Sequence, residues 1–270
     1  MDPTTRIITI LIIAAVLAAT AILTQVANGR RRRLGGADVF PLRAIPAYDE
    51  LPLMVGEAVE SDRPIHVSFG GAGIGGARTA LALASAEVFY QAARRAASGF
   101  RSPIVTVSDP SAIPLAYNAL YAAFRARGKA DQAPYAGVQW YAGNNARSMA
   151  FAAALTGLAH TEHPTGHILV GTWGAEIALV LDAANRRGAS SIAGSDDLVG
   201  QAVAFGMATT PLIGEEMFAA GAYLDDRGGT LSAAVTIDLL RWLLILAIGA
   251  GVALVLINSE ALDVGRILGR

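Results

Sequence analysis

From residue 65 onwards the chain alternates short apolar runs with longer alanine-rich runs, and this alternation restricts the fold more than any other feature. The first apolar run, IHVSF, leads into a helical pattern over residues 77–97. The expected strands are residues 65–69, 103–109, 137–143, 167–173 and 189–194. Strands that alternate with helices favour a parallel sheet covered on both faces, with right-handed crossovers. The sequence therefore predicts an α/β fold, a three-layer Rossmann-like domain with a mainly parallel sheet.

The helices expected between and after these strands are residues 77–97, 111–128, 145–162, 174–188 and 196–206. A last stretch, residues 209–226, also has a helical pattern, with Pro211 near its start. The segment before the first strand carries prolines at positions 41, 46, 52 and 64 and no sustained period, so we expect it to be partly extended.

Two long apolar segments flank the predicted domain, which we expect to be inserted between two transmembrane helices. Residues 7–26 contain no charge, and residues 239–257 contain only Arg241. About 20 such residues are enough to cross a hydrocarbon core. The expected division is an anchor at 1–29, a basic juxtamembrane and proline-containing lead-in at 30–64, the α/β domain at 65–228, and a second transmembrane helix with a short tail at 229–270.

Four consecutive arginines, Arg30, Arg31, Arg32 and Arg33, follow the first apolar segment. Cationic residues beside a membrane span are retained on the cytoplasmic side, and Arg241 lies on the same side of the second segment. We therefore expect a cell (inner) membrane protein with two spans, a cytoplasmic central domain and both termini outside. The arginines would contact anionic lipid headgroups of the bilayer.

Charge and cysteine content narrow the function further. Residues 34–238 hold 13 Lys or Arg residues against 19 Asp or Glu residues, so a nucleic-acid partner is not expected. The chain has no cysteine, which excludes thiolate chemistry and disulfides. Small residues in the apolar segments and alanine-rich helices in the domain lead us to expect a homo-oligomer or contacts with other membrane proteins.

The stretch HVSFGGAGIGGAR, residues 66–78, runs from a strand through a glycine-rich turn into a helix. Gly71, Gly73 and Gly76 satisfy G-x-G-x-x-G, a pattern that lets a phosphate approach a helix N-terminus. The acidic residue expected about 20 positions further on is missing, because Asp109 lies 33 residues past Gly76. Two interpretations stay open, purely structural glycines or capture of a nucleotide or another anion. NAD and FAD fit the incomplete fingerprint poorly.

Small and polar residues follow most of the expected strands, at the carboxyl edge where open parallel sheets bind ligands. Asp109 and Asp196 can instead cap helices, and Trp173 can either stack on a ligand or pack in the core. The candidate ligand-binding residues are Ser68, Gly70, Gly71, Gly73, Gly75, Gly76, Asp109, Asn144, Thr172, Trp173, Ser195 and Asp196.

Metal and catalytic motifs are weak or missing. His160, His163 and His167 are close in sequence, but Pro164 and Gly166 interrupt them and no cysteine joins them, so no metal site is expected. The chain has no G-x-S-x-G, H-E-x-x-H or P-loop motif. The pairs 196–197 and 215–216 are carboxylates that helix starts favour in any case.

Four segments together resemble a bacterial membrane-anchored domain family of unknown function. They are HVSFGGAGIGGA, PIVTVSDPSAIPLA, ILVGTWGAEIALVLDAANRRGASSIAGSDD and PLIGEEMFAAGAYL, spread over residues 66–224. The resemblance implies a membrane-tethered α/β domain and brings no activity, ligand or catalytic residue with it.

The leading hypothesis is a membrane-anchored, non-catalytic cytoplasmic domain that binds a ligand or partner, as a scaffold or subunit of a membrane assembly. The alternative is an enzyme acting on a nucleotide-linked or phosphorylated substrate, with the phosphate on the turn at residues 70–76 and Asp109 or Asp196 as acid/base group. The sequence leaves open which ligand is bound and whether the protein has any enzymatic activity.

Overall fold

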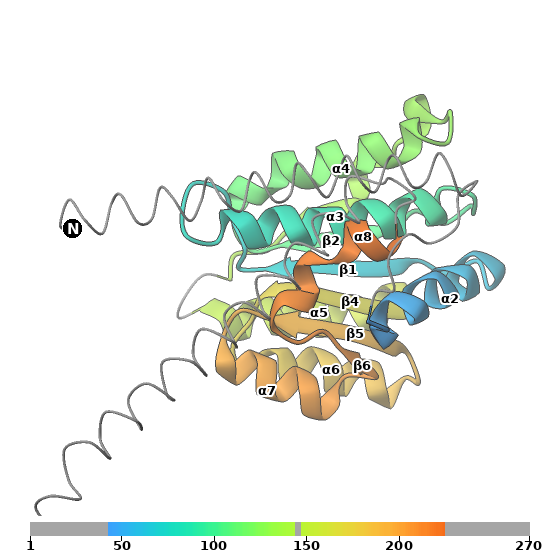
Figure 1. The fold of residues 1–270 in the computed structure, drawn as a ribbon. Helices are drawn as coiled ribbons and strands as arrows, with labels where there is room; N and C mark the ends of the chain where they lie inside the picture. The colour runs from blue at the N-terminus through green and yellow to red at the C-terminus, as the bar shows by residue number, and fades with distance from the viewer. Residues whose placement is uncertain (1–42, 144–146, 225–270) are drawn as a thin grey trace, which may run out of the picture. The chain divides into compact units, whose positions relative to one another are not determined.

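The computed structural model describes residues 43–143 and 147–224, and residues Arg43–Asp226 form one compact unit. This part of the chain folds as an α/β domain around a parallel sheet, as the sequence predicts (Figure 1). The six strands are β1 (Ile65–Gly70), β2 (Ile104–Val107), β3 (Val138–Trp140), β4 (Gly166–Thr172), β5 (Ser190–Ser195) and β6 (Thr210–Pro211).

The strands lie in the order β3-β2-β1-β4-β5-β6, and every neighbouring pair is parallel. The chain therefore builds one half of the sheet outward from β1 and then returns to build the other half from β4. The order reverses between β1 and β4, which pair through His66 and His167 among other residues. This is the strand order of dinucleotide-binding Rossmann folds.

Helices cover both faces of the sheet, so the domain is Rossmann-like. One face packs against α2 (Pro46–Glu60), α3 (Thr79–Ala96), α4 (Ile113–Arg125) and α8 (Ala220–Leu224). The other face packs against α5 (Ser148–Glu162), α6 (Ile177–Arg186) and α7 (Leu198–Met207).

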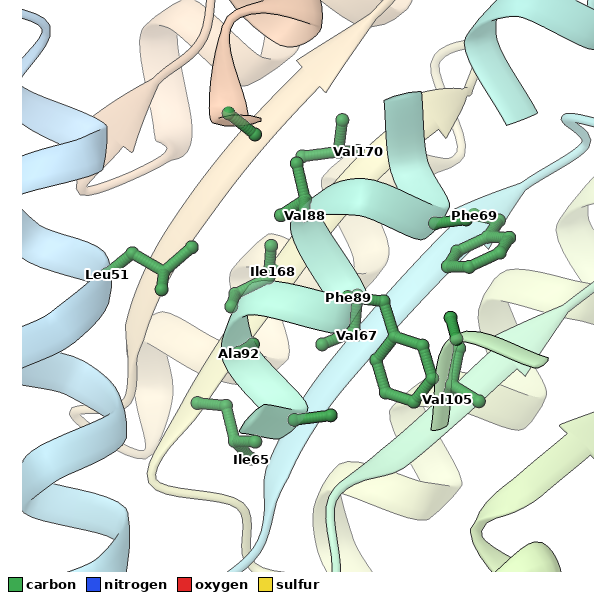
Figure 2. Close-up of a cluster of buried hydrophobic side chains, with 14 of the residues drawn as sticks. Leu51, Ile65, Val67, Phe69, Val88, Phe89, Ala92, Val105, Ile168 and Val170 are labelled. Carbon is green, nitrogen blue, oxygen red and sulfur yellow. The ribbon is translucent and has the colours of Figure 1, made fainter. Parts of the chain in front are cut away.

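Helix α3 forms the centre of the first face. Figure 2 shows Val88 and Phe89 of α3 above Val67 and Phe69 of β1 and Ile168 of β4. All five side chains are buried, and the rings of Phe69 and Phe89 meet edge to face with centroids 6.1 Å apart. Burying each such side chain contributes about 1.5–3 kcal/mol, which holds the crossover helix on the two central strands.

The segment before β1 forms helix α2, where its prolines predicted a partly extended chain. Pro46 occupies the first turn, where a missing N–H leaves no bond unmade, and Pro52 removes only one bond from the helix interior. The buried residues recur at helical spacing and outweigh that loss. They are Ala47, Tyr48, Leu51, Met54, Val55 and Ala58.

The single helix expected over residues 209–226 is also wrong. Its first residues form the edge strand β6, and a 3-10 helix (Gly214–Phe218) and the short α8 follow. Leu212 is fully buried and its N–H donates to the carbonyl of Ala193 at 2.8 Å, which ties this stretch to β5. Pro211 fits here because a proline at a sheet edge leaves no ladder bond broken.

No helix within residues 43–143 and 147–224 has the length and apolar character needed to cross a membrane. The two segments expected to do so, 7–26 and 239–257, lie outside the described residues. The same holds for Arg30, Arg31, Arg32 and Arg33, and for Asn144.

A pair of histidines is buried in the second face of the sheet. Nδ1 of His66 lies 2.9 Å from Nδ1 of His167, and Nε2 of His66 lies 2.9 Å from Oγ1 of Thr106. Only one of the two Nδ1 atoms can carry a hydrogen, because protonating both rings would set N–H against N–H. Burial lowers the pKa of both rings, that of His167 to about 4, and the neighbouring His167 lowers the pKa of His66 further.

We predict that the free energy of unfolding is highest above pH 6.5 and falls between pH 6.5 and 4. An unfolded histidine titrates near pH 6.5, whereas the folded pair takes up protons only at lower pH. Below pH 6.5 the unfolded chain therefore binds more protons than the folded one, which lowers the free energy of unfolding. His167 alone accounts for a loss of roughly 3 kcal/mol at pH 4, given its pKa of about 4. Urea unfolding of the full chain across this range measures the loss.

The control for this prediction is the double variant His66→Asn, His167→Asn, which keeps polar side chains and removes the titration. Its stability should fall less steeply over the same pH range. An equally steep fall in both proteins would assign the acid sensitivity to other groups.

Candidate functional site

A cleft of about 700 Å³ opens at the carboxyl edge of the sheet, where the strand order reverses between β1 and β4. The glycine turn after β1 forms one wall, and the ends of β2 and β4 form the others. The lining residues are Gly71, Gly73, Ile74, Gly76, Ala77, Arg78, Ser108, Asp109, Gly143, Ser148, Phe151, Thr172, Trp173, Gly174, Glu176 and Asp197.

The glycine turn is bonded to both neighbouring strands. The carbonyl of Gly70 accepts from the N–H of Ser108 at 3.0 Å, and the N–H of Gly71 donates to the carbonyl of Thr172 at 2.9 Å. Gly70 has φ of +54°, and a Cβ atom there would lie 2.3 Å from the Thr172 oxygen. Only glycine fits this position, so Gly70 has a structural role that the sequence interpretation left open.

Two hydroxyl groups hold the rest of the turn. The N–H groups of Gly75 and Gly76 donate to Oγ1 of Thr79 at 3.0 and 3.2 Å, and the N–H of Ile74 donates to Oγ of Ser111 at 2.8 Å. These amides thus point at oxygen atoms of the protein itself. Each hydroxyl oxygen lies where an oxygen of a ligand could lie, because an N–H group at a helix N-terminus can donate to either a hydroxyl or a phosphate oxygen.

Asp109 lies beside the turn in space although it is far from it in sequence. Its Oδ1 accepts from the N–H and Oγ of Ser111 at 2.9 and 2.7 Å, which caps the 3-10 helix Pro110–Ala112. A Cβ atom on Gly73 would lie 2.5 Å from its Oδ2, so this carboxylate packs directly on the turn. The long α3 accounts for the extra residues between the glycines and this acid.

Trp173 is buried at the end of β4, with 1% of its surface exposed. Its ring packs on Phe151 with centroids 5.4 Å apart, and its Nε1 faces Gly70 from beneath the turn. Neither Trp173 Nε1 nor Oγ1 of Thr172 has a hydrogen-bond partner in the part of the chain that is described. Two adjacent residues of the cleft wall therefore each carry an unsatisfied polar atom.

Ser195 holds the peptide of Trp173 in place. Its Oγ donates to the Trp173 carbonyl at 2.7 Å and accepts from the N–H groups of Trp173 and Asp197 at 3.0 and 3.1 Å. Ser195 is 2% exposed, so these bonds use its hydroxyl inside the protein. Asp197 caps α7, whereas Asp196 forms an ion pair at 3.5 Å with Arg78 of the turn.

The structure brings together about half of the residues proposed for the site from sequence. The cleft wall contains Gly71, Gly73, Gly76, Asp109, Thr172 and Trp173. Ser68, Gly70 and Ser195 lie outside the lining and bind main-chain atoms. Gly75 lies in the turn but outside the lining, and Asp196 pairs with Arg78. The sequence interpretation missed Arg78, Ser148, Phe151 and Glu176, of which Arg78 had a signal, being the first cation after the glycine pattern.

The three histidines of residues 160–167 do not converge. His167 is buried in β4 with His66, whereas Nδ1 of His160 and Nδ1 of His163 contact Arg187 on the surface. Within the described ranges there is no group of three side chains able to hold a metal ion. The β4 strand separates these residues, since it turns His167 into the sheet.

Comparison with known proteins identifies the family. The chain belongs to the family described as Domain of unknown function (DUF6754), whose model matches residues 4–264. The resemblance to a family of unknown function is thereby confirmed. No curated protein and no solved structure matches the chain.

We predict that Ser195→Ala lowers the free energy of unfolding by about 3 kcal/mol, because it leaves the buried N–H and carbonyl of Trp173 and the part-buried N–H of Asp197 without their partner. Chemical denaturation measures this loss. The matched control is Ser98→Ala, where an exposed hydroxyl bonds the carbonyl of Arg95 and the loss should stay below about 0.5 kcal/mol. Equal losses in the two variants would show that the bonds from Ser195 to the Trp173 peptide do not stabilise the fold.

Proposed function

We propose that residues 43–224 bind a small phosphorylated ligand of the nucleotide class, and that the protein acts as a non-catalytic ligand-binding domain in a membrane assembly. One observation carries this proposal. The cleft and the glycine turn lie where the strand order reverses between β1 and β4. In open parallel sheets ligands bind beyond the carboxyl ends of the strands at this point.

The phosphate end of the ligand would lie on the glycine turn. Arg78 is the one basic residue of the cleft wall described above. Its ion-pair partner Asp196 is partly exposed to solvent, so Arg78 can exchange this carboxylate for a phosphate. The N–H groups of Ile74, Gly75 and Gly76 donate to hydroxyl oxygens in the free protein. When the ligand binds, they would donate to phosphate oxygens instead. Charge-assisted bonds to phosphate are roughly twice as strong as bonds to a neutral hydroxyl, which favours this exchange.

The sugar end of the ligand would lie toward Asp109. Its Oδ1 is used by Ser111, whereas Oδ2 packs on the turn at the edge of the cleft. An acid at the end of the second strand accepts from ribose hydroxyls in dinucleotide-binding folds.

Tethering to the cell membrane is the second part of the proposal, and it rests on the sequence of residues 7–26, 30–33 and 239–257. The domain would then face the cytoplasm. Extraction of the full chain from cell membranes by alkaline carbonate, without detergent, would refute the tether.

A catalytic version of the same site has one observation in its favour, the position of Asp109 against the turn. That carboxylate could act as acid or base on a nucleotide-linked or phosphorylated substrate. Turnover of a bound nucleotide that is lost in Asp109→Asn, with binding retained, would favour the enzyme over the binding domain.

The ligand proposal predicts that Gly76→Ala abolishes binding of ADP while leaving the fold unchanged. A Cβ atom at Gly76 meets nothing within 4 Å, so the free protein accepts it, but it stands at the wall where a phosphate must approach. Calorimetric titration of the full chain with ADP, pyrophosphate and adenosine measures binding. We expect ADP to bind more tightly than adenosine, because the phosphate contacts are charge-assisted.

The matched control is Gly157→Ala on α5, which also meets nothing within 4 Å and lies outside the cleft lining. It should bind ADP as the unaltered chain does and should be no less stable. If the unaltered chain binds none of the three probes, the proposed ligand class is wrong.

A further inference from the structure

Helix α7 presents an apolar face to solvent. Leu198 is 85% exposed, Phe205 66% and Val199 55%, and the small residues Ala202, between them, and Gly206, after them, are exposed as well. These five residues, the α7 face, are spaced so that they form one stripe along the helix. Only Gly200 and Ala204 of α7 are buried against the domain.

Helix α7 differs from the other long helices because it contains no charged residue. Of the six helices with ten or more residues in the described ranges, α7 alone has no Asp, Glu, Lys, Arg or His. No charged residue occurs anywhere between Asp197 and Glu215. An exposed apolar stripe of this kind marks a contact surface rather than a solvated one.

Opposite charges lie at the two ends of this stripe. Asp196 and Asp197 directly precede α7, and because Asp196 pairs with Arg78, Asp197 supplies the net negative charge of this end. Arg186 ends α6 and Arg187 follows it, beside the end of α7, where Nδ2 of Asn185 donates to the carbonyl of Met207 at 3.0 Å. Arg186 pairs with Asp182 of its own helix, so Arg187 supplies the net positive charge of this end. The surface therefore runs from an acidic end through an apolar stripe to a basic end.

We propose that the α7 face binds the α7 face of a second copy of this chain, with the two helices antiparallel about a twofold axis. A twofold axis brings the acidic end of each copy to the basic end of the other, so the charges match without a different partner. A parallel pair would instead set like charges together. Ala202 lies next to the axis, where its small side chain lets the two helices approach closely.

Disulfide crosslinking tests this arrangement directly, because the chain contains no cysteine. Ala202→Cys in the full chain, oxidised with copper phenanthroline, should run as a covalent dimer with twice the mass. Facing Cβ atoms near the axis reach the 3.5–4.5 Å or so that a disulfide needs. The matched control is Leu83→Cys, which is 53% exposed on α3 at the other face of the sheet and should stay monomeric.

Coexpression distinguishes the antiparallel pair from a parallel one. In the antiparallel arrangement residue 199 of one copy lies near residue 206 of the other. Val199→Cys and Gly206→Cys should therefore crosslink with each other when coexpressed, and each should crosslink poorly alone. Phe205→Glu, added to Ala202→Cys, should abolish the dimer because it places like charges at the contact.

Two results would overturn the proposal. One is a covalent dimer of Ala202→Cys no more abundant than that of Leu83→Cys, which would mean that the α7 faces of two copies do not meet. The other is efficient crosslinking of Val199→Cys with itself and none with Gly206→Cys, which requires parallel helices. Neither result depends on ligand binding in the cleft.

Discussion

The end of β1 is bonded to the strands on both of its sides, and the cleft depends on this arrangement. Gly70 accepts from Ser108 after β2, and Gly71 donates to Thr172 of β4. Both bonds are made by the single peptide that joins Gly70 to Gly71, whose C=O and N–H point in opposite directions because the peptide is trans. Because the connections that leave β1 and β4 go to opposite halves of the sheet, the turn after β1 stands above the sheet edge and leaves a hollow beside it.

The polar groups around this hollow are mostly satisfied from within the protein. Asp109 accepts from Ser111, Asp197 from the first amides of α7, and Glu176 from the N–H of Gly174 at 2.8 Å. Backbone N–H donors thus satisfy one oxygen of each of these three carboxylates. The buried atoms without a partner among the lining residues described are Oγ1 of Thr172 and Nε1 of Trp173, so the polar groups at the end of β4 are the least satisfied of this wall.

Much of the fold could be predicted from sequence, because its period changes clearly between strands and helices. The predicted parallel sheet and the first five strands are present. Helix α2 was missed because Pro46 and Pro52 concealed an apolar spacing that is helical. Strand β6 was missed because two residues carry no period, and its pairing is set by the buried Leu212.

The site was harder to predict, since its residues are brought together by strand order, which no local pattern shows. Counting residues from Gly76 placed Asp109 too far away, yet the end of β2 sets it against Gly73. Residues expected to face a ligand, such as Ser195, instead bind the main chain. The pairing of His66 with His167 was also invisible, because the two residues are 101 positions apart and meet only through the β1–β4 register.

The indole N–H signal of Trp173 offers the most direct test of a ligand on this turn. Its Nε1 faces Gly70 and has no partner among the described residues, and the variant Trp173→Phe identifies its signal among those of the three tryptophans. We predict that titrating the nitrogen-15-labelled full chain with ADP shifts this signal to a saturating value. A signal that stays in place at millimolar ADP, ATP and pyrophosphate would contradict a nucleotide site between β1 and β4.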